Sequence, residues 1–159
     1  MARDTEFLGK IVDAGPFPRT HQSELEIVIP YTTIRRTRVA LRYVERMARG
    51  LACHVRLIRF QIVPIGVPID RSPVQLDFLE NQLKALETCL ACSRELFLVR
   101  EIGPILSRIL DGPSVLVMAT PKRFWRTSEE RLASILRRHG HTVLMLEENT
   151  LCSTSFSRC

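Results

Sequence analysis

The chain has 159 residues, of which 45% are hydrophobic and 25% charged, with a formal net charge of +6. This length and composition fit one globular domain and exclude collagen-like, low-complexity and intrinsically disordered proteins. Because the apolar runs fall far short of the roughly 18 residues that cross a bilayer, and no apolar signal core follows the charged N-terminus, we expect a cytoplasmic protein without a membrane span.

Residues 1–23 show no clear period and contain Gly15-Pro16-Phe17-Pro18, so we interpret them as an N-terminal arm. The regular pattern begins with an apolar strand over 25–29, which Pro30 ends. Thr32 or Thr33 then provides the N-cap of a helix that ends near Gly50. The apolar residues of this helix recur at helical spacing: Ala40, Leu41, Val44, Met47, Ala48 and Leu51.

The same helix carries a second, cationic stripe. Five arginines follow one another at steps of three and four, namely Arg35, Arg38, Arg42, Arg46 and Arg49. Such a stripe is typical of a solvated helix face, but it would also suit an acidic protein, nucleic-acid phosphates or anionic lipid headgroups. Specific nucleic-acid binding is disfavoured, because the chain has only 6% aromatic residues and no recognised binding motif.

The remaining pattern predicts four more strands and three more helices. The strands are expected over 54–60, 95–100, 114–119 and 142–146, and the helices over about 73–91, 104–110 and 128–139. Thr127-Ser128-Glu129-Glu130 forms a capping box that opens the last helix, with Leu132, Ile135 and Leu136 as its buried face. The apolar loop over 61–73 either packs on its own domain or is exposed as a lid or partner surface.

Five strands alternating with four helices predict an α/β fold, a three-layer sandwich with a parallel five-stranded sheet and helices on both faces. In such sheets ligands bind beyond the carboxyl ends of the strands, where the strand order reverses. The loops over 30–34 and 120–127 are therefore the candidate site.

The second of these loops is cationic and leads into a helix N-terminus, which favours an anion. The alternative is a basic turn in solvent with Trp125 packed on the domain. Glu129 and Glu130 oppose an anion, so we expect weak, salt-sensitive binding of phosphate or nucleotide. The candidate anion-binding residues are Thr32, Thr33, Lys122, Arg123, Arg126, Thr127 and Ser128.

Neither a metal site nor a catalytic set is predicted. Five cysteines, an odd number, suggest reduced thiols, and the C-x-x-C of Cys89 and Cys92 lacks the second close pair of a zinc site. His139 and His141 are more typical of a helix end than of a metal site. No Walker, G-x-S-x-G or H-E-x-x-H motif is present, so we expect a non-enzymatic protein without a cofactor beyond a weakly bound nucleotide or phosphate.

Three segments resemble the universal stress protein family. They are a first strand Val28-Ile29-Pro30 followed by a long amphipathic helix, the strand V-L-V-M-A-T over 115–120, and the closing pair of 136–139 and 143–146. The resemblance covers about 120 residues. It implies the strand order 3-2-1-4-5, dimers through the last strand, and a nucleotide site between strands 1 and 4 in the members that bind ATP.

The chain departs from the ATP-binding members of that family. They carry G-x2-G-x9-G-S/T after the fourth strand, because glycine lets main-chain amides approach phosphates. Here that spacing falls on Ala119, Lys122, Leu132 and Ala133, and no glycine occurs from 113 through 139. The acidic residue after the first strand is also missing.

We therefore expect a divergent member without the ATP motif, acting by binding as a regulatory or adaptor domain. Its parts are the arm over 1–23, the α/β domain over 24–147 and a tail over 148–159. The last strand is apolar on both faces, which favours a homodimer across its edge. The arginine stripe is the candidate surface for an acidic protein or transporter. The alternatives are a nucleotide-binding or nucleotide-hydrolysing protein with an unconventional pocket, or the cytoplasmic regulatory domain of a transporter.

Overall fold

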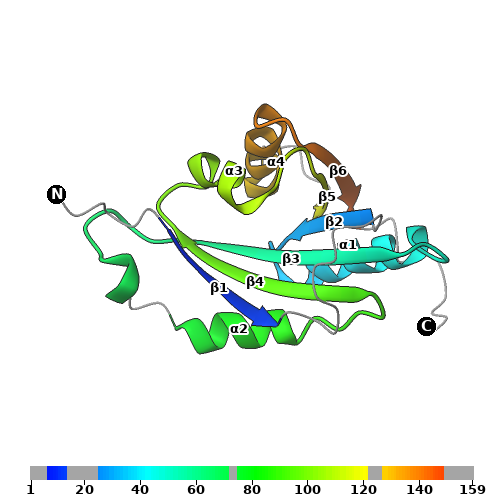
Figure 1. Ribbon diagram of the computed structural model, residues 1–159, viewed down its shortest axis with the longest axis horizontal. Coiled ribbons are helices and arrows are strands. Elements are labelled where there is room, and N and C mark those ends of the chain that lie inside the picture. The colour runs from blue at the N-terminus through cyan, green and yellow to red at the C-terminus, as the bar shows by residue number, and fades with distance from the viewer. Residues whose placement is uncertain (1–6, 14–24, 72–74, 122–126, 149–159) are drawn as a thin grey trace.

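The computed structural model describes residues 7–13, 25–71, 75–121 and 127–148. They form one six-stranded sheet in the order β1-β4-β3-β2-β5-β6 (Figure 1). All neighbouring strands are parallel except β1 and β4, which are antiparallel. The strands are β1 Phe7–Asp13, β2 Leu25–Pro30, β3 Cys53–Ile62, β4 Ala91–Val99, β5 Val115–Thr120 and β6 Thr142–Glu147.

The prediction of an α/β fold with a parallel sheet is confirmed, but the number of strands was wrong. The five expected strands correspond to β2 to β6, and their part of the sheet, β4-β3-β2-β5-β6, has the expected order. The sixth strand, β1, lies within the segment that we interpreted as an N-terminal arm, and it adds an antiparallel neighbour to β4. The arm therefore contributes to the sheet.

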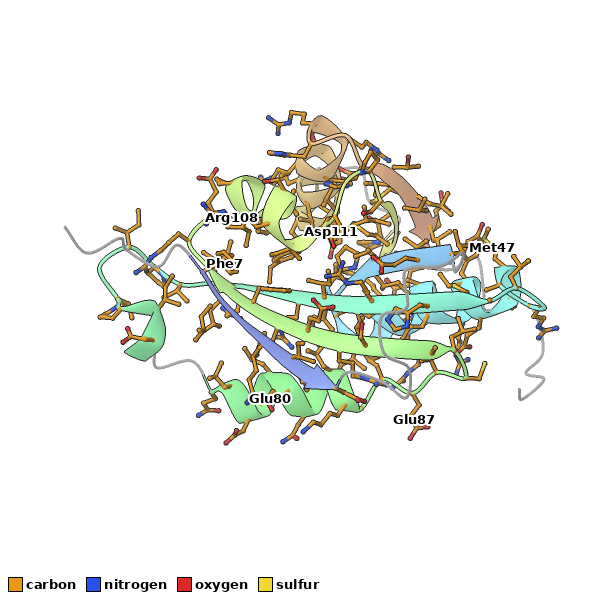
Figure 2. The ribbon with its side chains drawn as sticks, in the orientation of Figure 1. Phe7, Met47, Glu80, Glu87, Arg108 and Asp111 are labelled. Carbon is orange, nitrogen blue, oxygen red and sulfur yellow. The ribbon has the colours of Figure 1, made fainter. Side chains whose placement is uncertain are left out.

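Strand β1 escapes sequence analysis because most of its side chains are exposed or half-buried, so no apolar period marks it. Its position depends on Gly9, which faces Phe97 of β4. A Cβ atom at Gly9 would lie 2.7 Å from a ring carbon of Phe97. Phe7 completes the contact with its ring 6.3 Å from that of Phe97, and the guanidinium of Arg108 lies 6.0 Å from the Phe7 ring (Figure 2).

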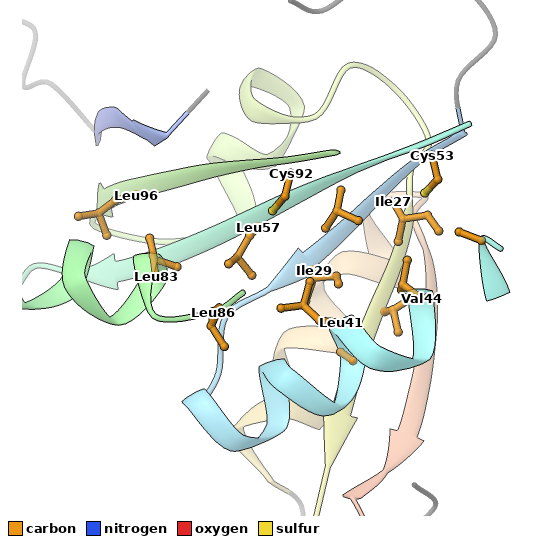
Figure 3. Packing of buried hydrophobic residues seen from close by; sticks show 14 of the residues in the cluster. Ile27, Ile29, Leu41, Val44, Cys53, Leu57, Leu83, Leu86, Cys92 and Leu96 are labelled. Atoms are coloured by element: carbon orange, nitrogen blue, oxygen red, sulfur yellow. The ribbon is translucent and has the colours of Figure 1, made fainter. Parts of the chain in front are cut away.

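The helices cover both faces of the sheet, as predicted. Helices α1 and α2 pack on one face and α3 and α4 on the other, so each face has its own apolar core (Figures 1 and 3). None of the described helices is long and apolar enough to cross a membrane. The helices are α1 Ile34–Met47, α2 Leu76–Lys84, α3 Leu106–Ile109 and α4 Ser128–Arg138, with short 3-10 turns at Ile69–Arg71 and Gly103–Ile105.

Helix α1 buries less of its predicted stripe than expected. Its core residues are Ala40, Leu41 and Val44, and Ala48 follows as the C-cap. The helix ends at Met47, and both Met47 and Leu51 are exposed. The apolar period therefore extends one turn beyond the part that contacts the sheet.

Helix α2 is also shorter than its leucine pattern predicted. It ends at Lys84 rather than near residue 91, and β4 begins at Ala91. Arg94 of β4 donates to the carbonyl oxygens of Leu83 at 3.2 Å and Leu86 at 2.7 Å. Since a helix end leaves carbonyl groups without intrahelical partners, this arginine stabilises the early end of α2.

The apolar loop after β3 packs in part on its own domain. Val63 and Ile69 are buried against Leu98, whereas Ile65 at the tip is 95% exposed. Arg100 holds the loop by donating to carbonyl oxygens of Val63, Pro64 and Val67, the last at 2.6 Å.

A buried ion pair crosses the sheet on the face covered by α3. Arg56 and Glu95 are each 3% exposed, and two guanidinium nitrogens of Arg56 donate to the two carboxylate oxygens of Glu95 at 2.9 and 3.0 Å. Arg56 also donates to the carbonyl oxygen of Ile109 at 3.0 Å and to Glu26 at 3.3 Å. Burial alone would lower the pKa of Arg56, but the contacts with Glu95 and Glu26 outweigh it and raise the pKa above its ordinary value. The pair therefore joins three strands to α3.

Candidate functional site

The candidate site lies where the strand order reverses, between the carboxyl ends of β2 and β5. Helix α1 follows β2 and helix α4 follows β5, and the two helices pack on opposite faces of the sheet. Their N-termini therefore lie on either side of the position at which open α/β sheets bind ligands.

The N-terminus of α1 uses both predicted threonines for its own structure. Thr33 is the N-cap, and its hydroxyl accepts from the backbone N–H of Arg36 at 3.3 Å. The backbone N–H of Thr32 donates to the hydroxyl of the buried Thr37 at 3.2 Å. Of the two predicted N-cap candidates, Thr32 and Thr33, the structure shows Thr33 as the N-cap. Whether either threonine also binds a ligand stays a prediction.

The N-terminus of α4 is a complete capping box, as predicted. The Thr127 hydroxyl accepts from the backbone N–H of Glu130 at 3.3 Å, and the Glu130 carboxylate accepts from the backbone N–H of Thr127 at 3.2 Å. The Ser128 hydroxyl donates to Glu129 at 3.1 Å. Two of the groups that we expected to contact an anion, the hydroxyls of Thr127 and Ser128, therefore have partners within the helix.

Glu129 connects the two helix ends, a role that the sequence did not reveal. It is 4% exposed, and one of its carboxylate oxygens accepts from Arg36 of α1 at 2.5 Å. Burial alone would raise the pKa of Glu129, but its own backbone N–H, the charge of Arg36 and the hydroxyls of Ser128 and Thr127 together lower the pKa below its ordinary value. The carboxylate is therefore held in its charged form.

Glu148, just after β6, completes this cluster. Its carboxylate contacts Arg36 at 3.5 Å and Arg35 at 2.6 Å. We call Arg35, Arg36, Glu129 and Glu148 the switch-point cluster. Its two cations and two anions balance, so the cluster itself has no excess positive charge to attract an anion. Arg36 and Glu129 are 93 positions apart, so no local sequence pattern could have paired them.

The other predicted anion-binding residues, Lys122, Arg123 and Arg126, lie outside the described residues, as does Trp125. Their proposed role stays a prediction.

The arginine stripe of α1 is exposed as expected. Arg35, Arg38, Arg42 and Arg46 lie on α1, Arg49 follows just after the end of the helix, and all five are exposed. Arg35 is partly neutralised by Glu148. Arg36 belongs to the switch-point cluster and turns toward α4 instead.

Within the described residues, no group of three or more His, Cys, Asp or Glu side chains could hold a metal ion. Cys53 and Cys92 are buried cysteines outside any disulfide, and burial raises the pKa of Cys92 to about 11. The expectation of reduced thiols was wrong for Cys89, which is disulfide-bonded.

His139 is the C-cap of α4, and His141 is buried and accepts from the Ser114 backbone N–H at 3.3 Å. Both histidines thus have structural positions.

A cavity of about 570 Å³ that the sequence did not predict lies between α4 and the last two strands. Its lining carries Glu130 together with Arg137 and Arg138, so it is mixed in charge. The remaining lining residues are Thr120, Ala133, Ser134 and Met145.

No family model matches the sequence, and no curated protein matches it either. Among solved structures, the chain is similar to a universal stress protein from Archaeoglobus fulgidus (TM-score 0.49, 14% identity, 76% of this chain and 92% of that chain). It is also similar to a universal stress protein family protein from Arabidopsis thaliana with AMP bound (0.46, 14%, 82% and 97%) and to a universal stress protein in complex with cAMP (0.43, 13%, 80% and 100%). These structural neighbours are universal stress proteins at low sequence identity.

Proposed function

We propose that the chain is a non-enzymatic regulatory or adaptor domain of the universal-stress-protein type, which acts by binding and does not hold ATP in the manner of the ATP-binding members. The order of the parallel strands agrees with this type of domain. The observation that carries the proposal is the buried Glu129 carboxylate, which lies at the N-terminus of α4 and is paired with Arg36.

A nucleotide phosphate bound at this place would meet two obstacles. The positive end of the α4 dipole already has a carboxylate beside it, and a phosphate near Glu129 would be repelled by it. Nη1 of Arg36 already donates to Glu129 and Nε to Glu148, so a phosphate would compete with two carboxylates for this guanidinium. The chain also lacks the glycines that would let backbone amides replace these groups.

Equilibrium binding of labelled ATP tests this proposal. We expect no magnesium-dependent saturable binding at this site with a Kd below about 100 μM, a free energy of roughly −5.5 kcal/mol. Incubation with ATP should release no product. Tight magnesium-dependent binding would contradict the proposal, and a released product would favour the alternative of a nucleotide-hydrolysing protein.

The arginine stripe is the surface that we propose for the partner. Over the 14 residues of α1, about 20 Å of helix, it presents cations on the side opposite the core. We propose an acidic protein surface as its partner, such as an acidic segment of a transporter, because arginine forms bidentate contacts with carboxylates.

We further propose that two copies pair across β6. This strand lies at an edge of the sheet, and Leu144 on it is 37% exposed. The backbone N–H of Thr142 donates toward β5, to Ser114 at 2.9 Å, so by alternation the Val143 carbonyl faces the free edge. Arg137 donates to that carbonyl at 3.0 Å and covers part of the edge.

Light scattering of the purified chain should therefore give a dimer at tens of micromolar, an order-of-magnitude range for such contacts. Leu144→Lys should shift the population toward monomer, because the lysine places a charge at the pairing edge. Arg137→Ala should shift it toward dimer, because the Val143 carbonyl becomes free to pair. A strict monomer for all three proteins would contradict the proposal.

A further inference from the structure

Arg59 lies near the carboxyl end of β3, on the face covered by α1 and α2. Leu57, two residues earlier, belongs to the core of that face, so alternation places Arg59 on the same side. The side chain is half-buried. Its guanidinium carbon lies 4.2 Å from the ring centroid of Tyr31, which follows β2 directly. The stack fixes the plane of the guanidinium group.

Gln82 of α2 contacts both the guanidinium and Tyr31. Its side-chain oxygen accepts from Nη1 of Arg59 and from the Tyr31 hydroxyl, the latter at 3.4 Å. With the oxygen used in this way, the amide nitrogen of Gln82 is left as a donor. Three side chains from three elements thus form one polar cluster, which we call the Arg59 cluster: Tyr31, Arg59 and Gln82.

The charge of Arg59 is not balanced by any carboxylate in the described parts of the chain. Arg36, Arg56 and Arg94 each form an ion pair with an acidic side chain, whereas the polar contacts of Arg59 are with neutral Gln82 and Tyr31. Burial lowers the pKa of Arg59, and Tyr31 compensates only in part. A cation that is partly removed from water without a counter-charge is costly.

The unused donors of Arg59 have the geometry that recognises oxyanions. Nη1 donates to Gln82, and among the hydrogen bonds of the described residues none runs from Nε or Nη2 to a carboxylate or carbonyl oxygen. These two nitrogens form the edge of the guanidinium that binds a carboxylate or phosphate through two parallel hydrogen bonds. The cluster also lies at the carboxyl ends of β2 and β3, where Tyr31 donates its backbone N–H to Ile58 at 2.7 Å, and ligands of open α/β sheets bind at such ends.

We propose that the Arg59 cluster is a binding site for the oxyanion of a small ligand, a phosphate or a carboxylate group. Arg59 contributes two hydrogen bonds and the charge, Gln82 contributes its amide N–H, and Tyr31 orients the guanidinium. This site goes beyond the proposed function, because it uses neither the switch-point cluster nor the loop between β5 and α4.

Thermal unfolding of the full chain in inorganic phosphate or in acetate, at constant ionic strength, tests the proposal. At a concentration ten times the Kd, we expect the midpoint of the wild-type protein to rise by about 3–5 °C. A response to phosphate alone assigns a phosphorylated ligand, and a response to acetate alone assigns a carboxylated one. No response to either anion would overturn the proposal.

Two variants locate the effect. Arg59→Met keeps the apolar stem but removes the donors, so the response to the anion should disappear. Gln82→Glu should raise the midpoint in the absence of added anion, because it gives Arg59 a carboxylate of its own, and it should also remove the response. Lys84→Met, which removes an exposed charge from α2 two residues after Gln82, should respond as the wild type does.

A response that persists in both Arg59→Met and Gln82→Glu would overturn the proposal, as would a lower midpoint for Gln82→Glu. The same variants separate this site from the proposed function. Weak binding of ATP that is lost in Arg59→Met belongs to the Arg59 cluster, whereas tight magnesium-dependent binding that survives Arg59→Met contradicts only the proposed function.

Discussion

Replacing Glu95 by alanine is expected to lower the free energy of unfolding by about 3–5 kcal/mol, because it leaves the buried Arg56 without the partner of its two strongest contacts. Glu26 compensates poorly, since its side chain is half exposed and lies 3.3 Å from Arg56. The carbonyl oxygen of Ile109 cannot neutralise the charge. This loss is a large fraction of the free energy of unfolding of a domain of this size.

Urea unfolding followed by circular dichroism measures this loss. The informative control is the double variant Arg56→Met/Glu95→Leu, which removes both charges and leaves apolar side chains of similar volume. Replacing a buried ion pair by apolar side chains often costs little stability or even stabilises the protein. The double variant should therefore be more stable than Glu95→Ala. If the free energy of unfolding of Glu95→Ala lies within about 1 kcal/mol of the wild-type value, Arg56 does not depend on Glu95 as described.

Replacing Glu129 by glutamine is expected to cost about 1–3 kcal/mol at neutral pH, since the charged acceptor of Arg36 and Ser128 is lost. The cost should depend on pH. The pKa of Glu129 is lower in the folded protein than its ordinary value, so the folded state favours the charged carboxylate. Its contribution is fully present above the unfolded pKa, about 4.3, and is lost as the pH falls through the lower folded pKa.

The difference in stability between the wild type and Glu129→Gln should thus be constant from neutral pH down to about pH 5 and then shrink toward acid. Glu130→Gln is the matched control on the same helix, because glutamine also serves in a capping box and Glu130 is exposed. It should change stability little at any pH. A difference for Glu129→Gln that grows as the pH falls would contradict the proposed cause.

Sequence analysis predicted the elements that have strong local signals. Thr127 and Glu130 identified the start of α4 because both halves of the capping box lie within four residues. The order of the parallel strands followed from the family resemblance. The end of α2 was wrong because Arg94, which satisfies the last carbonyl groups, lies in the next strand and not in the helix.

The candidate site could be located but not described from the sequence. The carboxyl ends of β2 and β5, which precede the two candidate loops, lie at the reversal of strand order as expected. The pairing of Arg36 with Glu129 could not be foreseen, because side chains far apart in the chain meet only after both helices have packed on the sheet. For the same reason the contact between Arg59 and Gln82 has no counterpart in any sequence motif.

The two ends of the sheet differ in a way that bears on polymerisation. At one end, β1 carries Lys10 and has a register shift between Ile11 and Asp13, features that discourage further strand pairing. At the other end, Arg137 covers a β6 carbonyl. Head-to-tail stacking of β6 on β1 would generate an open filament, whereas pairing of β6 with β6 is isologous and closes after two copies. The irregular β1 edge therefore favours a finite assembly over a fibre.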